Sequence, residues 1–240
     1  MRHLAANPFI AHECATKQIA PAPIPTNVYE TYGQCNEDLI VEALLRARLS
    51  QEQRQMNSVR YLEIGANHPV QTSATYLLYR LYGATGILVE ANPKLVPTLR
   101  RVRPLDTVVG CAITATHDDA VVLHIHDSNE LTSISRDHIA QFVSFGGVDG
   151  ITETMTVQNL HINEFLGMYV QSPVDFFSVD IEGFDAQVLD AMDTDFRPSI
   201  IQCEHEQRLG DFTEIMRRRR YLLAAVTDVN AIFVRADWPA

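Results

Sequence analysis

Two short apolar runs, each ending in an acid and turn-forming residues, constrain the fold more than any other feature of the sequence. They cover residues 59–67 (VRYLEIGAN) and 86–93 (GILVEANP). Runs of this kind, rich in Val, Ile, Leu and Tyr, are typical of buried parallel strands. Between them, Thr72 or Ser73 can cap a helix. The apolar residues of that segment recur at helical spacing, and they are Ala74, Leu77, Leu78 and Leu81. The pattern predicts a strand, a crossover helix and a second strand of an open α/β sheet.

Ligands of open α/β sheets bind at the carboxyl edge, where both runs end. Glu63 provides an acceptor for an ammonium or hydroxyl group, and Gly65 lets the backbone approach a ligand closely. Glu90 can accept hydrogen bonds from both hydroxyls of a ribose. The later glycines of a pyrophosphate-binding G-x-G-x-x-G are replaced by Asn67 and Val70, which disfavours a nicotinamide-dependent oxidoreductase. An unphosphorylated ribonucleoside with an amino-acid-like tail fits both acids, and S-adenosylmethionine is such a molecule.

Several segments together resemble the FkbM family of class I S-adenosylmethionine-dependent methyltransferases. In the family's order, over about residues 29–235, they are YGQCNEDLI (32–40), LEIGAN (62–67), GILVEANP (86–93), GCAI (110–113), DFFSVDIEG (175–183) and RPSIIQCE (197–204). The resemblance implies a Rossmann-like α/β fold: a seven-stranded, mostly parallel sheet with one antiparallel strand and helices on both faces. The methyltransferase domain would span residues 29–240, after an extended or partly disordered lead of residues 1–28.

The same resemblance implies which residues contact S-adenosylmethionine. They are Glu63, Gly65, Ala66, Asn67, Glu90, Asn92, Ala112 and Asp180. In this class the segment at residues 111–113 lies against the adenine, although plain core residues would look the same. Residues 32–34 would fold over the cofactor, and a helix packed on the sheet edge is the alternative. Residues 67–69 read Asn-His-Pro where many family members carry Asn-Asp-Gly, so the loop beside the methionine tail departs from the family pattern.

Apolar periodicity and turn signals predict the remaining elements. We expect strands at 106–113, 120–126, 154–157, 174–180 and 199–204, helices from 36 through 49, at 160–169, around 186–192 and ending at 217–220, and a hairpin of 221–226 with 231–235. Asn92 and Pro93 are expected to begin the helix after the second strand. Residues 127–150 look irregular, with glycines at one end. We assign them to the mouth of the substrate site, with a simple surface insertion as the alternative.

Methyl transfer to a hydroxyl requires an aligned acceptor oxygen and a group that removes its proton. Candidate catalytic side chains follow the predicted strand ends: His68 after the first, Asp180 and Glu182 after the fourth, and Glu204 with His205 after the fifth. In one mechanism His205 or His68 is the base and Asp180 orients it. Asp180 and Glu182 also suit a purely structural role, as the N-terminal cap and a first-turn acid of the next helix.

A second mechanism uses a divalent metal, magnesium or manganese. Here Asp180, Glu204 and His205 bind an ion that holds two substrate oxygens and acidifies one of them, an arrangement seen in some related O-methyltransferases. Magnesium prefers oxygen ligands, so a site containing histidine would instead suit manganese or iron. The sequence leaves both mechanisms open.

Charge and composition narrow the choice of partner and compartment. The 240 residues carry a formal net charge of −11, which argues against a nucleic-acid substrate. The four cysteines lack C-x-x-C spacing and suit buried thiols better than a disulfide or zinc framework. The sequence contains neither an apolar run of membrane-spanning length nor a signal-peptide pattern, so we expect a cytoplasmic protein that does not bind membranes. A homo-oligomer is left open.

The function expected from these observations is S-adenosylmethionine-dependent O-methylation of a small molecule. By family resemblance the hydroxyl acceptor is a sugar or a glycosylated or polyketide-type natural product. Two alternatives stay open: N-methylation of an amine, and a non-catalytic nucleoside-binding protein with the same fold.

Overall fold

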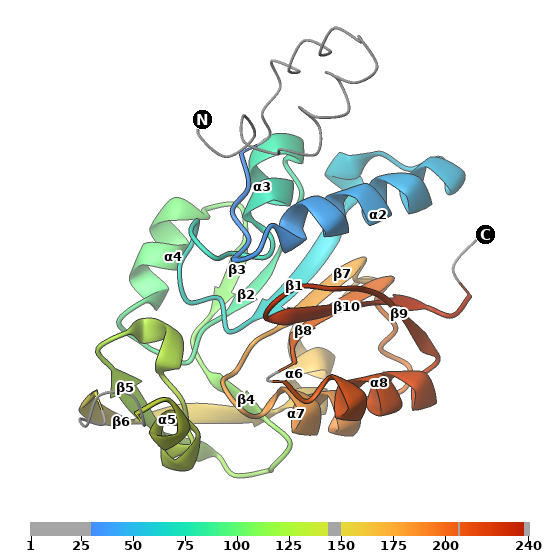
Figure 1. The fold of residues 1–240 in the computed structure, drawn as a ribbon. Coiled ribbons are helices and arrows are strands. Elements are labelled where there is room, and N and C mark those ends of the chain that lie inside the picture. Colours follow the sequence, from blue (N-terminus) through green and yellow to red (C-terminus); the bar gives the residue numbers. More distant parts are fainter. Residues whose placement is uncertain (1–29, 144–149, 206, 238–240) are drawn as a thin grey trace, which may run out of the picture. The chain divides into compact units, whose positions relative to one another are not determined.

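The computed structural model describes residues 30–143, 150–205 and 207–237. The predicted lead of residues 1–28 therefore lies outside the described residues. From Thr31 onward the described chain belongs to one compact unit. Its central sheet is made of β1 (Arg60–Ile64), β2 (Thr85–Val89), β3 (Thr107–Val109), β7 (Phe176–Val179), β8 (Ile200–Glu204), β9 (Tyr221–Val226) and β10 (Asn230–Arg235) (Figure 1).

The strand order is β3-β2-β1-β7-β8-β10-β9. Every neighbouring pair is parallel except those of β10, which runs antiparallel to both β8 and β9. The predicted seven-stranded, mostly parallel sheet with one antiparallel strand is thus confirmed. The order reverses direction between β1 and β7, and this is the place where open α/β sheets bind their ligands.

Helices cover both faces of the sheet because successive side chains along each strand point to opposite sides. Tyr61 belongs to the apolar core under α2 (Glu37–Gln51), α3 (Tyr76–Tyr82) and α4 (Val96–Val102). Leu62, the next residue, belongs to the core under α6 (Ile162–Tyr169), α7 (Asp185–Ala191) and α8 (Leu209–Arg218). The two cores fix the sheet between two helical layers, so its carboxyl edge is held rigidly.

A second, three-stranded sheet flanks the carboxyl edge of the central sheet, and one of its strands differs from the sequence prediction. It has the order β4-β6-β5, with β4 (Ala112–Thr114), β5 (Ala120–His126) and β6 (Ile151–His161). The single strand predicted over residues 106–113 is wrong, because the chain leaves the central sheet at Gly110 and Cys111 and then pairs with β6. Periodicity could not reveal the change, since both short strands are apolar.

Two helices begin later than predicted. Thr72 and Ser73 do not cap α3, which starts at Tyr76 because the polar groups of the preceding segment bind the Glu63 carboxylate instead. Leu81, predicted on the buried side of this helix, is 49% exposed. Asn92 and Pro93 do not start α4 either. The Asn92 side chain accepts a hydrogen bond from the backbone of Lys94, which forms a turn before the helix.

Residues 127–150 are more regular than predicted. They contain the 3-10 helix η3 (Asn129–Leu131) and the helix α5 (Arg136–Val143), whose first turn is capped by Ser135 through the backbone N–H of His138. Residues 144–149 lie outside the described residues. The irregular structure expected for residues 127–150 is therefore wrong for the described part.

Most remaining elements match the predicted ranges within a few residues, and β5 and β9 match them fully. The strand predicted at 154–157 is longer, since β6 runs from Ile151 to His161 and thereby holds both β4 and β5. Within the described ranges, the helices are too short or too polar to traverse a lipid bilayer.

Candidate functional site

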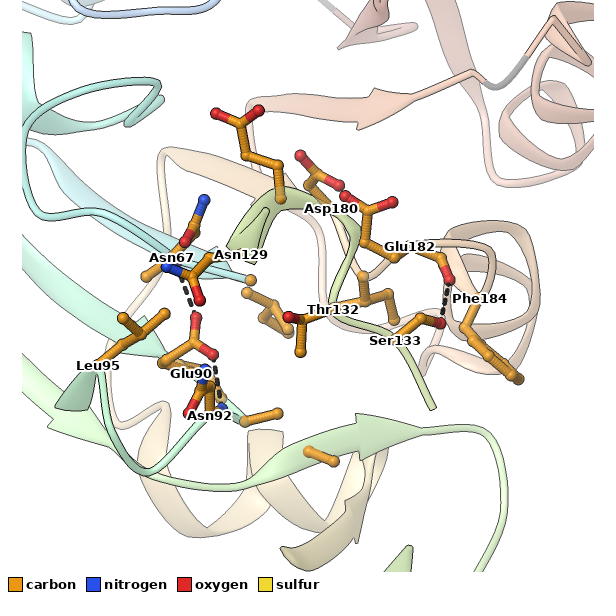
Figure 2. Close-up of a pocket in the computed structure, with 18 of the residues that line it drawn as sticks. Asn67, Glu90, Asn92, Leu95, Asn129, Thr132, Ser133, Asp180, Glu182 and Phe184 are labelled. Atoms are coloured by element: carbon orange, nitrogen blue, oxygen red, sulfur yellow. Dashed lines mark hydrogen bonds between the residues drawn. The ribbon is translucent and has the colours of Figure 1, made fainter. Parts of the chain in front are cut away.

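A cavity of about 330 Å³ opens at the carboxyl ends of β1, β2, β7 and β8. Figure 2 shows Glu90 on one side of it and Asp180 with Glu182 on the other. The structure brings most of the predicted cofactor-binding residues to this cavity. Those that line it are Gly65, Ala66, Asn67, Glu90, Asn92, Ala112 and Asp180.

The turn after β1 is built around a close approach of two backbones. Gly65 has φ of +85°, and a Cβ at this position would lie 1.7 Å from the carbonyl oxygen of Asp180. The backbone N–H of Asp180 in turn donates to the carbonyl of Ile64, at 3.0 Å. Glycine is therefore required here both by conformation and by space. The result is a bare stretch of backbone at the floor of the cavity.

Glu90 joins two turns through its carboxylate. One oxygen accepts a hydrogen bond from the backbone N–H of Asn67 at 2.7 Å, and the other accepts one from the N–H of Asn92 at 2.6 Å (Figure 2). The residue is 7% exposed. Burial raises the pKa of Glu90, and the backbone donors oppose that rise. Each oxygen keeps a second lone pair that can accept from a ligand hydroxyl.

An apolar wall lies next to this carboxylate. Residues of β4, β5 and the preceding turn supply Cys111, Ala112, Ile113 and Leu123 to the cavity lining. Burial raises the pKa of the Cys111 thiol to about 12, so this sulfur stays protonated and acts as an apolar surface. A flat aromatic base would fit such a wall beside the Glu90 carboxylate.

The segment of residues 129–134 forms a further part of the wall, and all six residues line the cavity. Ser133 pairs with His124 of β5 in an isolated bridge, which fixes the segment to the small sheet. Its hydroxyl also donates to the carbonyl of Glu182 at 2.8 Å. The stretch that we assigned to the substrate mouth therefore contributes directly to the cavity.

Glu63 does not line this cavity. It is fully enclosed on the α3 side of β1, where its carboxylate accepts from the backbone N–H of Ala74 at 2.9 Å and from the hydroxyls of Ser73 and Thr75. It borders a small polar cavity of about 20 Å³ that adjoins the larger one and shares Gly65 and Asp180 with it. Burial raises the pKa of Glu63, and the nearby guanidinium of Arg103 opposes that rise. Its predicted role in binding the methionine tail stays a prediction.

Three carboxylates gather at one end of the larger cavity. Asp180, Glu182 and Glu204 each place an oxygen so that these atoms lie within 4.8 Å of one another. Two of them come from the turn after β7, and Glu204 ends β8. Acidic side chains at the ends of adjacent parallel strands meet at one sheet edge, as the sequence predicted. The all-oxygen donor set fits a hard divalent ion such as magnesium or manganese.

The two predicted histidine bases lie outside the residues that line the cavity. His68 is exposed, and its Nδ1 accepts hydrogen bonds from the backbone N–H groups of Val70 and Gln71. The Nε2 of His205 lies 3.2 Å from the carbonyl of Thr227. These contacts do not direct either ring to the acidic end of the cavity. His205 is not part of the cluster formed by Asp180, Glu182 and Glu204.

Sequence reasoning missed His138, on α5. Its Nε2 lies 3.0 Å from a carboxylate oxygen of Glu182, and the imidazole is almost fully buried. A lone histidine in a polar stretch gives no periodic signal, and no sequence pattern links it to a residue 44 positions later. Gln34, in contrast, lines the cavity as the family resemblance implied for residues 32–34.

These residues fit S-adenosylmethionine as a group. The buried Glu90 carboxylate suits the ribose hydroxyls, the wall at Ala112 suits the adenine, and the bare backbone at Gly65 leaves space for the tail. Asp180 and Glu182, which line another part of the same cavity, could accept a proton from a methyl acceptor.

Comparison with known proteins gives a family match. A family model described as the methyltransferase FkbM domain matches residues 63–226. A search among curated proteins found no significant match. Among solved structures, the chain is similar to a methyltransferase from Geobacter sulfurreducens, with 12% identity, a TM-score of 0.40 and coverage of 95% of this chain and 88% of that chain. It is also similar to an O-methyltransferase from Bacillus cereus in complex with SAH, with 12% identity, a TM-score of 0.38 and coverage of 95% and 90%.

Proposed function

The chain belongs to the FkbM methyltransferase family, and we propose that it transfers the methyl group of S-adenosylmethionine to a hydroxyl oxygen of a small molecule. The observation that carries this proposal is the opposition, across one cavity, of the buried Glu90 carboxylate and the carboxylates of Asp180 and Glu182 (Figure 2). The first suits a ribose, and the second group suits an acceptor that must lose a proton.

The cofactor is held by the turns that follow β1 and β2. Glu90 would accept from the ribose hydroxyls, and its own position is fixed by the backbone of Asn67 and Asn92. Ala112 and its neighbours would pack against the adenine. When bound, S-adenosylmethionine supplies a methyl group on a sulfonium, which is attacked in line by the acceptor oxygen.

The acceptor proton is taken up at the acidic end of the cavity. Glu182 is our candidate for the base, because its carboxylate lines the cavity and has the buried imidazole of His138 behind it. An oxygen of Asp180 lies within 4.8 Å of an oxygen of Glu182, so both carboxylates could contact the same acceptor hydroxyl. Removing a positioned general base typically costs a factor of about 10² to 10⁴ in rate.

A divalent metal is a second arrangement for the same end of the cavity. Asp180, Glu182 and Glu204 would hold magnesium or manganese, and the ion would make an acceptor hydroxyl more acidic. The proximity of these three carboxylates favours them as the metal ligands. The ligands predicted from the sequence included His205 in place of Glu182. Turnover before and after EDTA treatment, with magnesium or manganese added back, separates the two arrangements.

The charge of the cavity bears on the class of acceptor. Its lining includes the acids Glu130, Asp180, Glu182 and Glu204, and no Lys, Arg or His occurs among the described lining residues. An acceptor with phosphate, sulfate or carboxylate groups would be repelled. A neutral polyhydroxylated molecule, such as a sugar or a glycosylated or polyketide-type natural product, suits this environment better. The same acids also suit a cationic amine, which keeps N-methylation as the second candidate.

The test is a methyl-transfer assay with S-adenosylmethionine labelled in its methyl group. The acceptor panel should contain neutral sugars, glycosylated polyketides and their amino-sugar analogues, and mass spectrometry should locate the added methyl group. Methylation on oxygen supports the proposal, and methylation on nitrogen supports the second candidate. Binding of S-adenosylhomocysteine without turnover of any acceptor would favour a non-catalytic nucleoside-binding protein.

A further inference from the structure

Glu182 is held in an unusual backbone conformation directly beside the cavity. Its φ is +51°, in the left-handed region that residues with side chains rarely adopt, and the following Gly183 has φ of +98°. Such a conformation persists only where surrounding contacts fix it. Short stretches of this kind gather at functional sites, so the contacts that hold the turn are of interest.

The segment before α5 supplies a backbone contact to this turn. The hydroxyl of Ser133 donates to the carbonyl of Glu182 at 2.8 Å, as Figure 2 shows. The same Ser133 oxygen accepts from the backbone N–H of Ser135 at 3.0 Å. The carbonyl of Glu182 is thus tied to the wall of the cavity formed by residues 129–134.

His138 supplies the contact to the side chain. Its Nε2 lies 3.0 Å from Oε2 of Glu182, and the side chains of His138 and Glu182 are only 8% and 18% exposed. The imidazole lies over Gly183, where an added Cβ would come within 2.7 Å of Nδ1. Only glycine at this position lets the ring reach Glu182. The His138 ring, Gly183 and the Glu182 carboxylate are therefore packed directly against one another.

Two neighbours of this carboxylate carry the same charge. Asp180 and Glu204 place oxygens within 4.8 Å of the Glu182 oxygen. Like charges at this separation push a side chain toward solvent or toward protonation. The hydrogen bond from the buried Nε2 of His138 opposes displacement of Glu182 toward solvent, because it fixes the position of the carboxylate.

We propose that His138 is a positioning residue, which holds the Glu182 carboxylate in the cavity at the point where the acceptor hydroxyl binds. The role of that carboxylate in catalysis rests on the proposed function, whereas its placement by His138 does not. His138 itself does not line the cavity. It acts through Glu182, and α5 thereby becomes part of the acceptor site.

The test compares three variants. His138→Ala removes the donor, His138→Gln keeps an amide nitrogen near the position of Nε2, and His138→Asn carries a shorter amide that does not reach Glu182. In crystals, with and without S-adenosylhomocysteine, we expect Glu182 to leave its position in the Ala and Asn variants and to keep it in the Gln variant. His117→Ala is the matched control, because that ring is 71% exposed and lies outside the cavity lining.

Kinetics with an acceptor from the panel give a second readout. We expect kcat to fall about 10- to 100-fold in the Ala and Asn variants and to recover in the Gln variant. The dissociation constant for S-adenosylhomocysteine should change less than twofold throughout. An unmoved Glu182 in the His138→Ala crystals would overturn the proposal. A displaced Glu182 with an unchanged kcat would instead defeat the role of Glu182 as the base in the proposed function. Absence of S-adenosylhomocysteine binding by the wild type would instead defeat the proposed function, and the ligand-free crystals would still decide the role of His138.

Discussion

The carboxylate of Glu90 accepts a hydrogen bond from the backbone N–H of Asn67 at 2.7 Å, and this bond joins the end of β2 to the turn after β1. The partner of that turn on the other side is Asp180, whose backbone passes directly over Gly65. Three strand ends are therefore fixed to one another before any ligand arrives. A site preorganised in this way loses little conformational entropy on binding.

The close approach at Gly65 predicts a severe effect of a single methyl group. Gly65→Ala places a Cβ 1.7 Å from the carbonyl oxygen of Asp180 in a backbone with φ of +85°. We expect the free energy of unfolding to fall by roughly 1–3 kcal/mol from backbone strain alone, with a further loss from the clash. Urea denaturation followed by circular dichroism measures the change.

Gly167 provides the matched control for that substitution. It lies inside α6, is exposed, and has open space around an added Cβ. Gly167→Ala should stabilise the protein by about 0.5–1 kcal/mol, because alanine is the better helix former. Equal effects of the two substitutions would show that the approach of Asp180 to Gly65 is not a constraint.

Arg103 is the centre of a buried polar cluster under α3. Its guanidinium donates to the Asp106 carboxylate at 2.8 Å and to the hydroxyls of Tyr61 and Thr75, and the side chains of Arg103 and Asp106 are both fully buried. Arg103→Met leaves the acids Asp106 and Glu63 without this cation. We expect a loss of about 3–5 kcal/mol of unfolding free energy.

The control for Arg103 is an exposed ion pair of similar length. Arg217 pairs with Glu214 on the surface of α8, and exposed pairs contribute little. Arg217→Met should leave the urea midpoint unchanged. A shift as large as that of Arg103→Met would contradict the importance that we assign to the buried cluster.

The raised pKa of Glu90 predicts how cofactor affinity depends on pH. Binding requires the carboxylate as an acceptor, so affinity for S-adenosylhomocysteine should be constant above the pKa of Glu90 and fall as the pH drops through it. Because burial raises this pKa, the decline begins above the ordinary value of 4.5. The slope should not exceed about tenfold per pH unit, as one proton is involved.

Ligand-free stability should respond in the opposite direction. The folded-state pKa of Glu90 lies above the unfolded value. Between the unfolded and the folded pKa of Glu90, the folded chain therefore binds more protons than the unfolded chain. The contribution of Glu90 to stability falls as the pH rises through this range. Glu90→Gln should bind weakly and lose the pH dependence of affinity. A pH profile of affinity that is unchanged in this variant would assign the titration to another group.

The acidic lining predicts discrimination by acceptor charge. A neutral sugar and its phosphorylated form, compared as acceptors, should differ at least tenfold in kcat/KM in favour of the neutral form, because Asp180, Glu182 and Glu204 repel an anion. The difference should shrink with added salt as the charges are screened. Equal values at low salt would mean that the acceptor does not approach the acids.

The sequence identified some of these residues for physical reasons and missed others. Glu90 and Asp180 each end an apolar run, and parallel strands end at a common edge, so the pattern alone predicted that both acids would lie at that edge. Glu63 lies only two residues before Gly65, but side-chain alternation turns it toward α3, where local donors hold it. Whether an acid at a strand end faces the ligand or the helix layer depends on tertiary packing, which the local sequence pattern does not reveal.

His138 shows the other limit of sequence reasoning. Its contact with Glu182 joins residues on two elements that are far apart in the chain. The segment was predicted as part of the substrate mouth on the basis of its polar and glycine residues, yet the helix α5 was not. The contact depends on the docking of that helix on the turn after β7, for which no local signal exists.

The most direct test of the account is calorimetric titration of S-adenosylhomocysteine into the wild type and into Glu90→Ala. The account predicts micromolar binding by the wild type. It also predicts a loss of roughly 10- to 100-fold in the variant, because hydrogen bonds to a charged group contribute about 1.5–3 kcal/mol each. Circular dichroism of Glu90→Ala provides the check that the fold is retained. Wild-type protein that fails to bind S-adenosylhomocysteine, or a folded Glu90→Ala variant that binds it as tightly as the wild type, would contradict the assignment of this cavity as the cofactor site.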